Sequence, residues 1–117
     1  MLFERAEELG RLIGQTNEAK ALRRAEEALR SDETARGHLE KMQTLARQMD
    51  QLMAQGQMPD ETMTQGYESA VKEFELSAVG QGYIVARSNF EKVMQKVNEE
   101  MAKGIEKGTT SNIITLG

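Results

Sequence analysis

One histidine and three pairs of adjacent glutamates are the residues of this chain that could carry acid–base or metal chemistry. They are His38, Glu7–Glu8, Glu26–Glu27 and Glu99–Glu100. A di-metal helical bundle needs inward-facing carboxylates together with Glu-x-x-His motifs, and the sequence has none of those motifs. Adjacent glutamates on a helix diverge by about 100°, so we expect these pairs to lie on solvated surfaces. No metal site is predicted.

Other catalytic arrangements are equally missing from the sequence. The chain has no cysteine, which excludes disulfides, thiol catalysis and thiolate metal sites. It has no glycine-rich phosphate-binding motif and no context for a Ser-His-Asp triad. His38 precedes the apolar Leu39, and we expect it to have a structural role. The residues therefore predict a protein that is not an enzyme, with no catalytic residues and no cofactor.

Eight methionines are the most unusual feature of the composition. Met42, Met49 and Met53 share one face of a predicted helix, and Met58 and Met63 follow across a turn. Methionine is unbranched and adaptable, so these residues either fill a core or form an exposed patch that binds a partner. A subunit interface would satisfy both interpretations. The residues predicted at a partner or subunit interface are Met42, Met49, Leu52, Met53, Met58, Met63, Phe90, Met94 and Met101.

Charge and hydropathy restrict the partners that we expect. The 117 residues carry 15 basic and 19 acidic groups, a net charge of -4, mixed along the chain. This pattern lacks the basic stripe of a direct nucleic-acid binder, and the densest basic point, Arg23–Arg24, is flanked by glutamates. No signal-peptide pattern and no apolar run near the roughly 20 residues of a membrane span is present. We expect a cytoplasmic protein without a membrane partner.

Apolar residues recur at helical spacing through most of the chain. The third predicted helix is the most regular, because its apolar positions from Ala35 to Met53 step by four and three. Gly56 is placed to end it, and Pro59–Asp60 to begin the next helix. Thr16 or Asn17, and Ser31 or Asp32, can cap earlier helices. The predicted helices cover about 3–14, 17–30, 33–55, 61–76 and 80–107.

The last predicted helix has about 27 residues and would be roughly 40 Å long. A compact chain of this length has a radius of gyration of only about 13 Å. We therefore predict an all-α fold: an elongated antiparallel helical bundle of about four to five helices, with two long helices, as a dimer. Residues 1–107 are predicted to form one helical domain. Residues 108–117 are predicted to form a flexible tail, in which 113–116 could dock on the bundle or on a neighbour.

Three stretches resemble the YlbF/YmcA family of small helical bacterial regulators, which includes the YheA-like proteins. The first has a helix, a short polar break and an alanine-rich run: AEELGRLIGQTNEAKALRRAEEAL. The second has a D-x-x-A-x-x-x-L start, a long glutamine-rich helix and a closing glycine: SDETARGHLEKMQTLARQMDQLMAQGQ. The third has a small break, an aromatic–Ile pair and a closing helix with Asn98: VGQGYIVARSNFEKVMQKVNEEMAKGI. The resemblance covers about residues 4–107.

The resemblance implies self-associating helices and regulatory work through protein partners. Family members are associated with competence, sporulation and biofilm control, and some act in complexes that modulate an endoribonuclease and mRNA processing. Some of these complexes carry iron–sulfur clusters on cysteines. This sequence departs from that pattern because it has no cysteine, so the chain alone lacks the ligands for such a cluster.

Two functional hypotheses follow. The first is a non-enzymatic helical regulator or adaptor, homo-oligomeric and acting through specific protein partners. The second is a structural oligomerisation or chaperone-like module that shields client surfaces. The regulator should bind one or two specific proteins, whereas the chaperone-like module should bind unfolded chains broadly and weakly.

Overall fold

A computed structural model of the protein describes residues 1–116, with side chains described as far as Thr110. Within this part of the chain all regular secondary structure is α-helix. The five helices are α1 (Leu2–Gly14), α2 (Asn17–Ser31), α3 (Glu33–Ala54), α4 (Glu61–Leu76) and α5 (Ala78–Leu116). The predicted all-α class is confirmed, as are the two long helices, α3 and α5.

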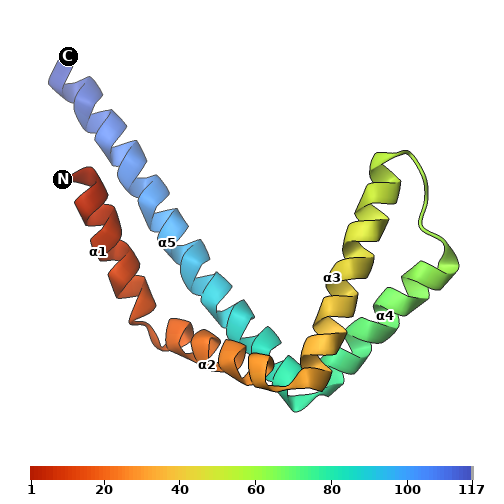
Figure 1. The fold of residues 1–117 in the computed structure, drawn as a ribbon. Helices are drawn as coiled ribbons and strands as arrows, with labels where there is room; N and C mark the ends of the chain where they lie inside the picture. The colour runs from red at the N-terminus through yellow and green to blue at the C-terminus, as the bar shows by residue number, and fades with distance from the viewer. Residues whose placement is uncertain (117) are drawn as a thin grey trace.

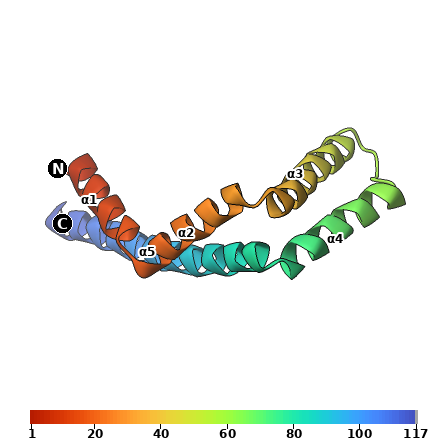
Figure 2. The same ribbon diagram turned by 60° about the horizontal axis from the view of Figure 1, so that its bottom comes forward.

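The helices form two arms that meet at an angle (Figure 1). In the first arm α2 packs antiparallel to α5, and α1 lies near the far half of α5 (Figure 2). The second arm is the antiparallel hairpin of α3 and α4. The molecule measures 63 × 39 × 19 Å, and its radius of gyration is 20.4 Å. A compact chain of this length has a radius near 13 Å, so the predicted elongation is confirmed. The predicted dimer stays a prediction.

Short polar side chains fix where the helices begin. Thr16, Asp32 and Asp60 each accept a hydrogen bond from the backbone N–H three residues later, at 3.1, 2.9 and 2.8 Å. Such caps satisfy one of the four unpaired N–H groups of a helix start. The structure thus selects Thr16 over Asn17 and Asp32 over Ser31, and the predicted helix start at Asp60 is confirmed.

Gly56 ends α3 as predicted. Its φ is 77°, the left-handed conformation that glycine adopts without a steric penalty. The N–H of Gly56 donates to the Met53 carbonyl at 3.0 Å, and the N–H of Gln57 donates to the Leu52 carbonyl at 2.8 Å. This pair of bonds is the Schellman arrangement. The segment from Gly56 to Asp60 is therefore a turn between the two helices of one arm.

The core lies where the two arms meet. Leu29, Ala35 and Phe74 form a buried cluster, in which Phe74 is only 1% exposed. Tyr83 meets Phe74 edge to face, with ring centroids 6.3 Å apart. Other buried apolar residues are small, namely Ala19, Ala70 and Ala86. Because each arm is little more than two helices thick, most other apolar side chains are only half-buried.

A tight turn joins α4 to α5. The last helix was predicted to begin at about residue 80, and in the structure it begins at Ala78. Ser77 Oγ accepts a hydrogen bond from Gly80 N–H at 2.9 Å and donates to the Phe74 carbonyl at 2.8 Å. A single bend residue, Ser77, thus separates the two helices.

The far end of α5 also differs from prediction. The helix continues to Leu116, beyond the end predicted near residue 107. The Thr109 and Thr110 hydroxyls donate to the carbonyls of Ile105 and Glu106, at 3.1 and 2.9 Å, a pattern compatible with continued helix. The predicted flexible tail at 108–117 stays a prediction. The predicted docking of 113–116 concerns side chains that lie outside those described.

Candidate functional site

The nine predicted interface residues lie on both arms, so they do not form one surface. Three of them belong to α5 in the first arm. The other six belong to α3, α4 and the turn between them, and lie at several heights along the second arm.

The tip of the α3–α4 arm carries most of the predicted methionine patch. Met49, Leu52 and Met63 are half-buried between the two helices. Met53 and Met58 are 54% and 85% exposed. Each interpretation of the methionines therefore holds for different residues. Met49 and Met63, with Leu52, are partly buried within the arm. Met53 and Met58 form an exposed pair, which we call the arm-tip surface.

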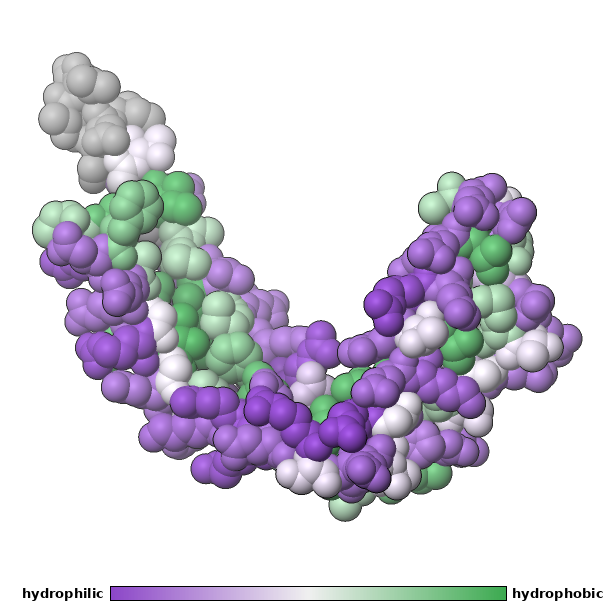
Figure 3. Space-filling view, in the orientation of Figure 1, coloured by the Kyte–Doolittle hydropathy of each residue, from purple (hydrophilic) through white to green (hydrophobic). Residues whose placement is uncertain are grey.

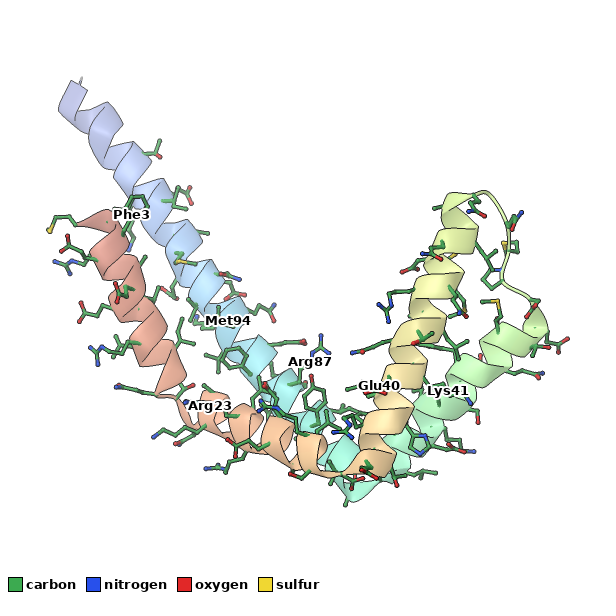
Figure 4. The ribbon with its side chains drawn as sticks, in the orientation of Figure 1. Phe3, Arg23, Glu40, Lys41, Arg87 and Met94 are labelled. Carbon is green, nitrogen blue, oxygen red and sulfur yellow. The ribbon has the colours of Figure 1, made fainter. Side chains whose placement is uncertain are left out.

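The remaining predicted residues lie nearer the core or along α5. Met42 packs against the buried cluster at the base of its arm. Phe90 and Met94, both on α5, are half-buried, and Met101, further along the same helix, is 45% exposed. Figure 4 shows Met94 on α5. Only Met101 of this group offers a substantial apolar surface to a partner.

A larger apolar surface lies at the far end of the first arm, and most of it is absent from the predicted site. It comprises exposed side chains of α1 and α5: Leu2, Phe3, Leu12, Met101 and Ile105. Phe3 is 82% exposed and Ile105 is 71% exposed. Helix α1 buries none of its residues. Figure 3 shows hydrophobic residues gathered along this arm. We call this set the α1–α5 surface.

The whole chain exposes an unusually large area. Its accessible surface is 9040 Å². A compact chain of this size would expose roughly 6,400 Å², so the excess is about 2,600 Å². Part of this exposed surface is apolar, because large hydrophobic side chains of both arms are exposed, and apolar patches on a protein surface mark protein-interaction sites.

The concave side of the bend contains a small hollow. Leu39, Phe74 and Tyr83 line its floor, and its volume is ≈ 270 Å³. Arg87 lies at its edge and pairs with Glu91 at 3.1 Å. Figure 4 shows Arg87 and Glu40 between the two arms. The hollow has an apolar floor and a charged edge, a combination that suits an apolar side chain of a partner better than a reacting group.

Two of the polar residues considered in the sequence, His38 and Arg23, contact a neighbouring helix. His38 Nδ1, on α3, lies 3.2 Å from Glu73 Oε2 on α4, so the pair links the two helices of one arm. Arg23 donates to the Gly14 carbonyl at 2.6 Å, at the negative end of α1, and so ties α2 to α1 (Figure 4). In the described residues no three His, Asp or Glu side chains cluster as metal ligands. Within the same residues no helix has the length and apolarity of a membrane span.

Comparisons with known proteins identify a family and a solved structure with the same fold. The model of the family described as "Control of competence regulator ComK, YlbF/YmcA" matches residues 2–106. The crystal structure of Bacillus subtilis RicA in complex with RicF matches with a TM-score of 0.70. The match covers 92% of this chain and 96% of that chain, at 18% sequence identity, which shows a shared fold. A search of curated proteins gave no match.

Proposed function

Because the chain belongs to the YlbF/YmcA family, we propose that it is a non-enzymatic regulatory protein that acts by binding other proteins. The observation that carries this proposal is the exposed apolar surface at the far ends of both arms. Monomeric proteins seldom leave such surface without a partner. We place this work in the cytoplasm.

The family description and the similar structure support this kind of work. The family is described by control of a competence regulator, and RicA was crystallised in complex with another protein, RicF. We therefore propose that this chain regulates by entering a protein complex. Competence, sporulation, biofilm formation and endoribonuclease-linked mRNA processing are the candidate processes. The chain contributes no cysteine to such a complex.

The arm-tip surface is our candidate for the contact with a regulatory partner. Met53 and Met58 project apolar, adaptable side chains at the end of a two-helix arm. The contact of His38 Nδ1 with Glu73 Oε2, at 3.2 Å, helps to hold the two helices of that arm together. A partner could therefore bind the tip without contacting the core at the bend.

Affinity purification from the native cell tests the proposal. A regulator should retain one or two specific proteins in near-stoichiometric amounts. Recovery of no protein besides the chain itself would overturn it.

The alternative is a structural or chaperone-like module. The exposed methionines of the arm-tip surface favour this alternative, because methionine-rich surfaces can adapt to partners of many shapes. It predicts that the purified protein suppresses aggregation of several unrelated unfolded proteins. The regulator predicts no such suppression at equimolar amounts.

A further inference from the structure

An open hollow lies where α1, α2 and α5 meet, and we call it the α1–α2 hollow. Its volume is ≈ 550 Å³, and its apolar lining consists of Ala19, Leu22 and Phe90. Leu22 and Phe90 are half-buried, so each still presents apolar surface to the hollow. These residues belong neither to the arm-tip surface nor to the α1–α5 surface, so the hollow is a separate feature of the first arm.

The charged residues that line the α1–α2 hollow are mostly cations. Arg11 comes from α1, and Lys20 and Arg23 come from α2. Glu26 is the acid among the lining residues that the structure describes. The chain as a whole has a net charge of -4, so a positively charged hollow lies on an acidic protein. Such a local reversal of sign attracts an anionic partner and repels a cationic one.

Two of the three cations are available to a ligand. Lys20 is exposed and makes no ion pair with any residue that the structure describes. Arg23 donates one N–H to the Gly14 carbonyl at 2.6 Å, which holds the guanidinium in place (Figure 4). A guanidinium has five N–H groups in a rigid fork, so four remain for a carboxylate. Arg11 is partly neutralised, because it lies 3.7 Å from Glu8.

The backbone around the α1–α2 hollow is fixed by local hydrogen bonds. Thr16 Oγ1 donates to the Ile13 carbonyl at 2.7 Å and accepts from the Ala19 N–H at 3.1 Å. Together with the bond from Arg23 to Gly14, these contacts join the end of α1 to the first turns of α2. A site whose backbone is already ordered loses less conformational freedom when it binds a ligand.

We propose that the α1–α2 hollow is a docking site for an acidic segment of a protein partner. Carboxylates of the segment pair with the three cations, and Arg23 takes the best of these contacts because its fork fits a carboxylate at two points. An apolar side chain of the segment packs against Leu22 and Phe90. This inference rests on the proposed function and deepens it, because it names the chemistry of a second partner contact, on the arm that lacks the arm-tip surface.

The arrangement of charges favours an acidic peptide over a nucleic acid. A nucleic acid needs a continuous basic stripe that follows its phosphates. Here Glu8 lies beside Arg11, and Glu26 lines the hollow itself, so two acids interrupt the cations. A short peptide places a few carboxylates on the cations and an apolar side chain between them, and so avoids these acids.

Fluorescence anisotropy with the purified full chain tests the proposal. Three labelled probes are compared: a short peptide in which acidic residues flank two leucines, the same peptide with serines in place of the leucines, and a single-stranded RNA of equal net charge. The leucine peptide should bind about five-fold more tightly than either of the others, and its affinity should fall about ten-fold between about 0.05 and 0.5 M salt. A Kd above about 1 mM for the leucine peptide, equal binding of the serine peptide, or tighter binding of the RNA would overturn the proposal.

Two double variants locate the bound peptide. Lys20→Glu with Arg23→Glu should weaken binding of the leucine peptide about ten-fold or more, because two attractions become repulsions. Lys41→Glu with Arg47→Glu is the matched control, since it makes the same change in net charge at two exposed positions of α3, and should weaken binding less than about three-fold. Equal losses would mean that only net charge matters and would overturn the proposal. So would dissociation of an oligomer by the first variant alone, seen by light scattering, because a second copy would then occupy the hollow.

Single variants keep the proposal testable if loss of the bond from Arg23 to Gly14 disturbs the junction of α1 and α2. Lys20→Glu leaves that bond intact and should still weaken peptide binding about three-fold or more, whereas Lys41→Glu should leave it nearly unchanged. Equal affinities of these two variants would overturn the proposal. All of these measurements use purified protein and defined probes. Failure to capture any partner from cells would therefore contradict the proposed function, whereas captured partners without peptide binding would overturn this inference alone.

Discussion

Gly80, in the first turn of α5, packs directly against the carbonyl oxygen of Phe74 near the end of α4. A Cβ at position 80 would collide with this oxygen and would lie 2.7 Å from Ser77 Oγ. Ser77 bridges the same two residues by hydrogen bonds. The close approach therefore sets the direction in which α5 leaves α4, and with it the angle between the arms that carry the two apolar surfaces.

Replacing Gly80 with Ala should destabilise the fold. The added methyl group forces the backbone of α5 away from Phe74, at a cost of about 1–3 kcal/mol. Urea unfolding followed by circular dichroism measures the change. Gly82→Ala is the matched control, because nothing lies within 4 Å of its Cβ position, and it should stabilise the helix by about 0.5–1 kcal/mol. Equal effects of the two variants would refute the role given to Gly80.

The core at the bend should depend on one aromatic ring. Phe74 is 1% exposed and meets Tyr83, so Phe74→Ala should lower the free energy of unfolding by about 3–5 kcal/mol. Thermal and urea denaturation measure it. Phe3→Ala is the control, because it removes a phenyl ring that is 82% exposed. It should leave the free energy of unfolding of the isolated chain nearly unchanged. A loss below about 1 kcal/mol for Phe74→Ala would contradict this core.

The turn at the arm tip should depend on its cap. Asp60 accepts the Met63 N–H at 2.8 Å, so Asp60→Ala should cost about 0.5–2 kcal/mol. Asp50→Ala is the control, since Asp50 is exposed within α3, where alanine is the better helix former. Urea unfolding followed by circular dichroism compares the loss of unfolding free energy in the two variants. A destabilisation by Asp50→Ala as large as that by Asp60→Ala would argue against the cap.

The far half of α5 should respond to acid through Glu100. Hydrogen bonds from Lys103 and from Lys96 hold the pKa of this carboxyl below its ordinary value of 4.5. A lowered folded-state pKa adds stability at pH values above the ordinary value, and this stability is lost as the pH falls through the folded-state pKa. Lys103→Gln should raise the pKa of Glu100, measured by NMR titration of the side-chain carbonyl. Lys107→Gln should leave it unchanged, and an identical response to both variants would contradict the pairing.

Local chemistry explains which parts of the fold could be predicted from the sequence. The helix boundaries at Asp32, Gly56 and Asp60 follow from caps and from one left-handed glycine, and these act within a few residues. The helical faces follow from apolar spacing. At the end of α3 Leu52 is half-buried, whereas Met53 is 54% exposed, so the buried face there includes Leu45, Met49 and Leu52 and leaves Met53 out.

The angle between the arms could not be predicted, because it depends on contacts between distant elements. Leu29, Ala35 and Phe74 come from three different helices and meet only at the bend. The same angle places the predicted interface residues on two arms. The α1–α5 surface was missed because Leu2 and Ile105 are far apart in sequence. The apolar residues Val97, Met101 and Ile105, which recur every four residues, were the signal that could have indicated the α5 part of this surface.

The central claim is that this chain works by binding a specific protein partner. The most direct test is quantitative affinity purification from the native cell, with wild-type protein beside the Met53→Glu, Met58→Glu double variant. We predict that one or two proteins are recovered with the wild type and are depleted about ten-fold or more with the variant, because each Glu places an unpaired charge against an apolar partner surface. Recovery of the same proteins by both forms would contradict the arm-tip contact. Recovery of no specific protein by the wild type would contradict the claim itself.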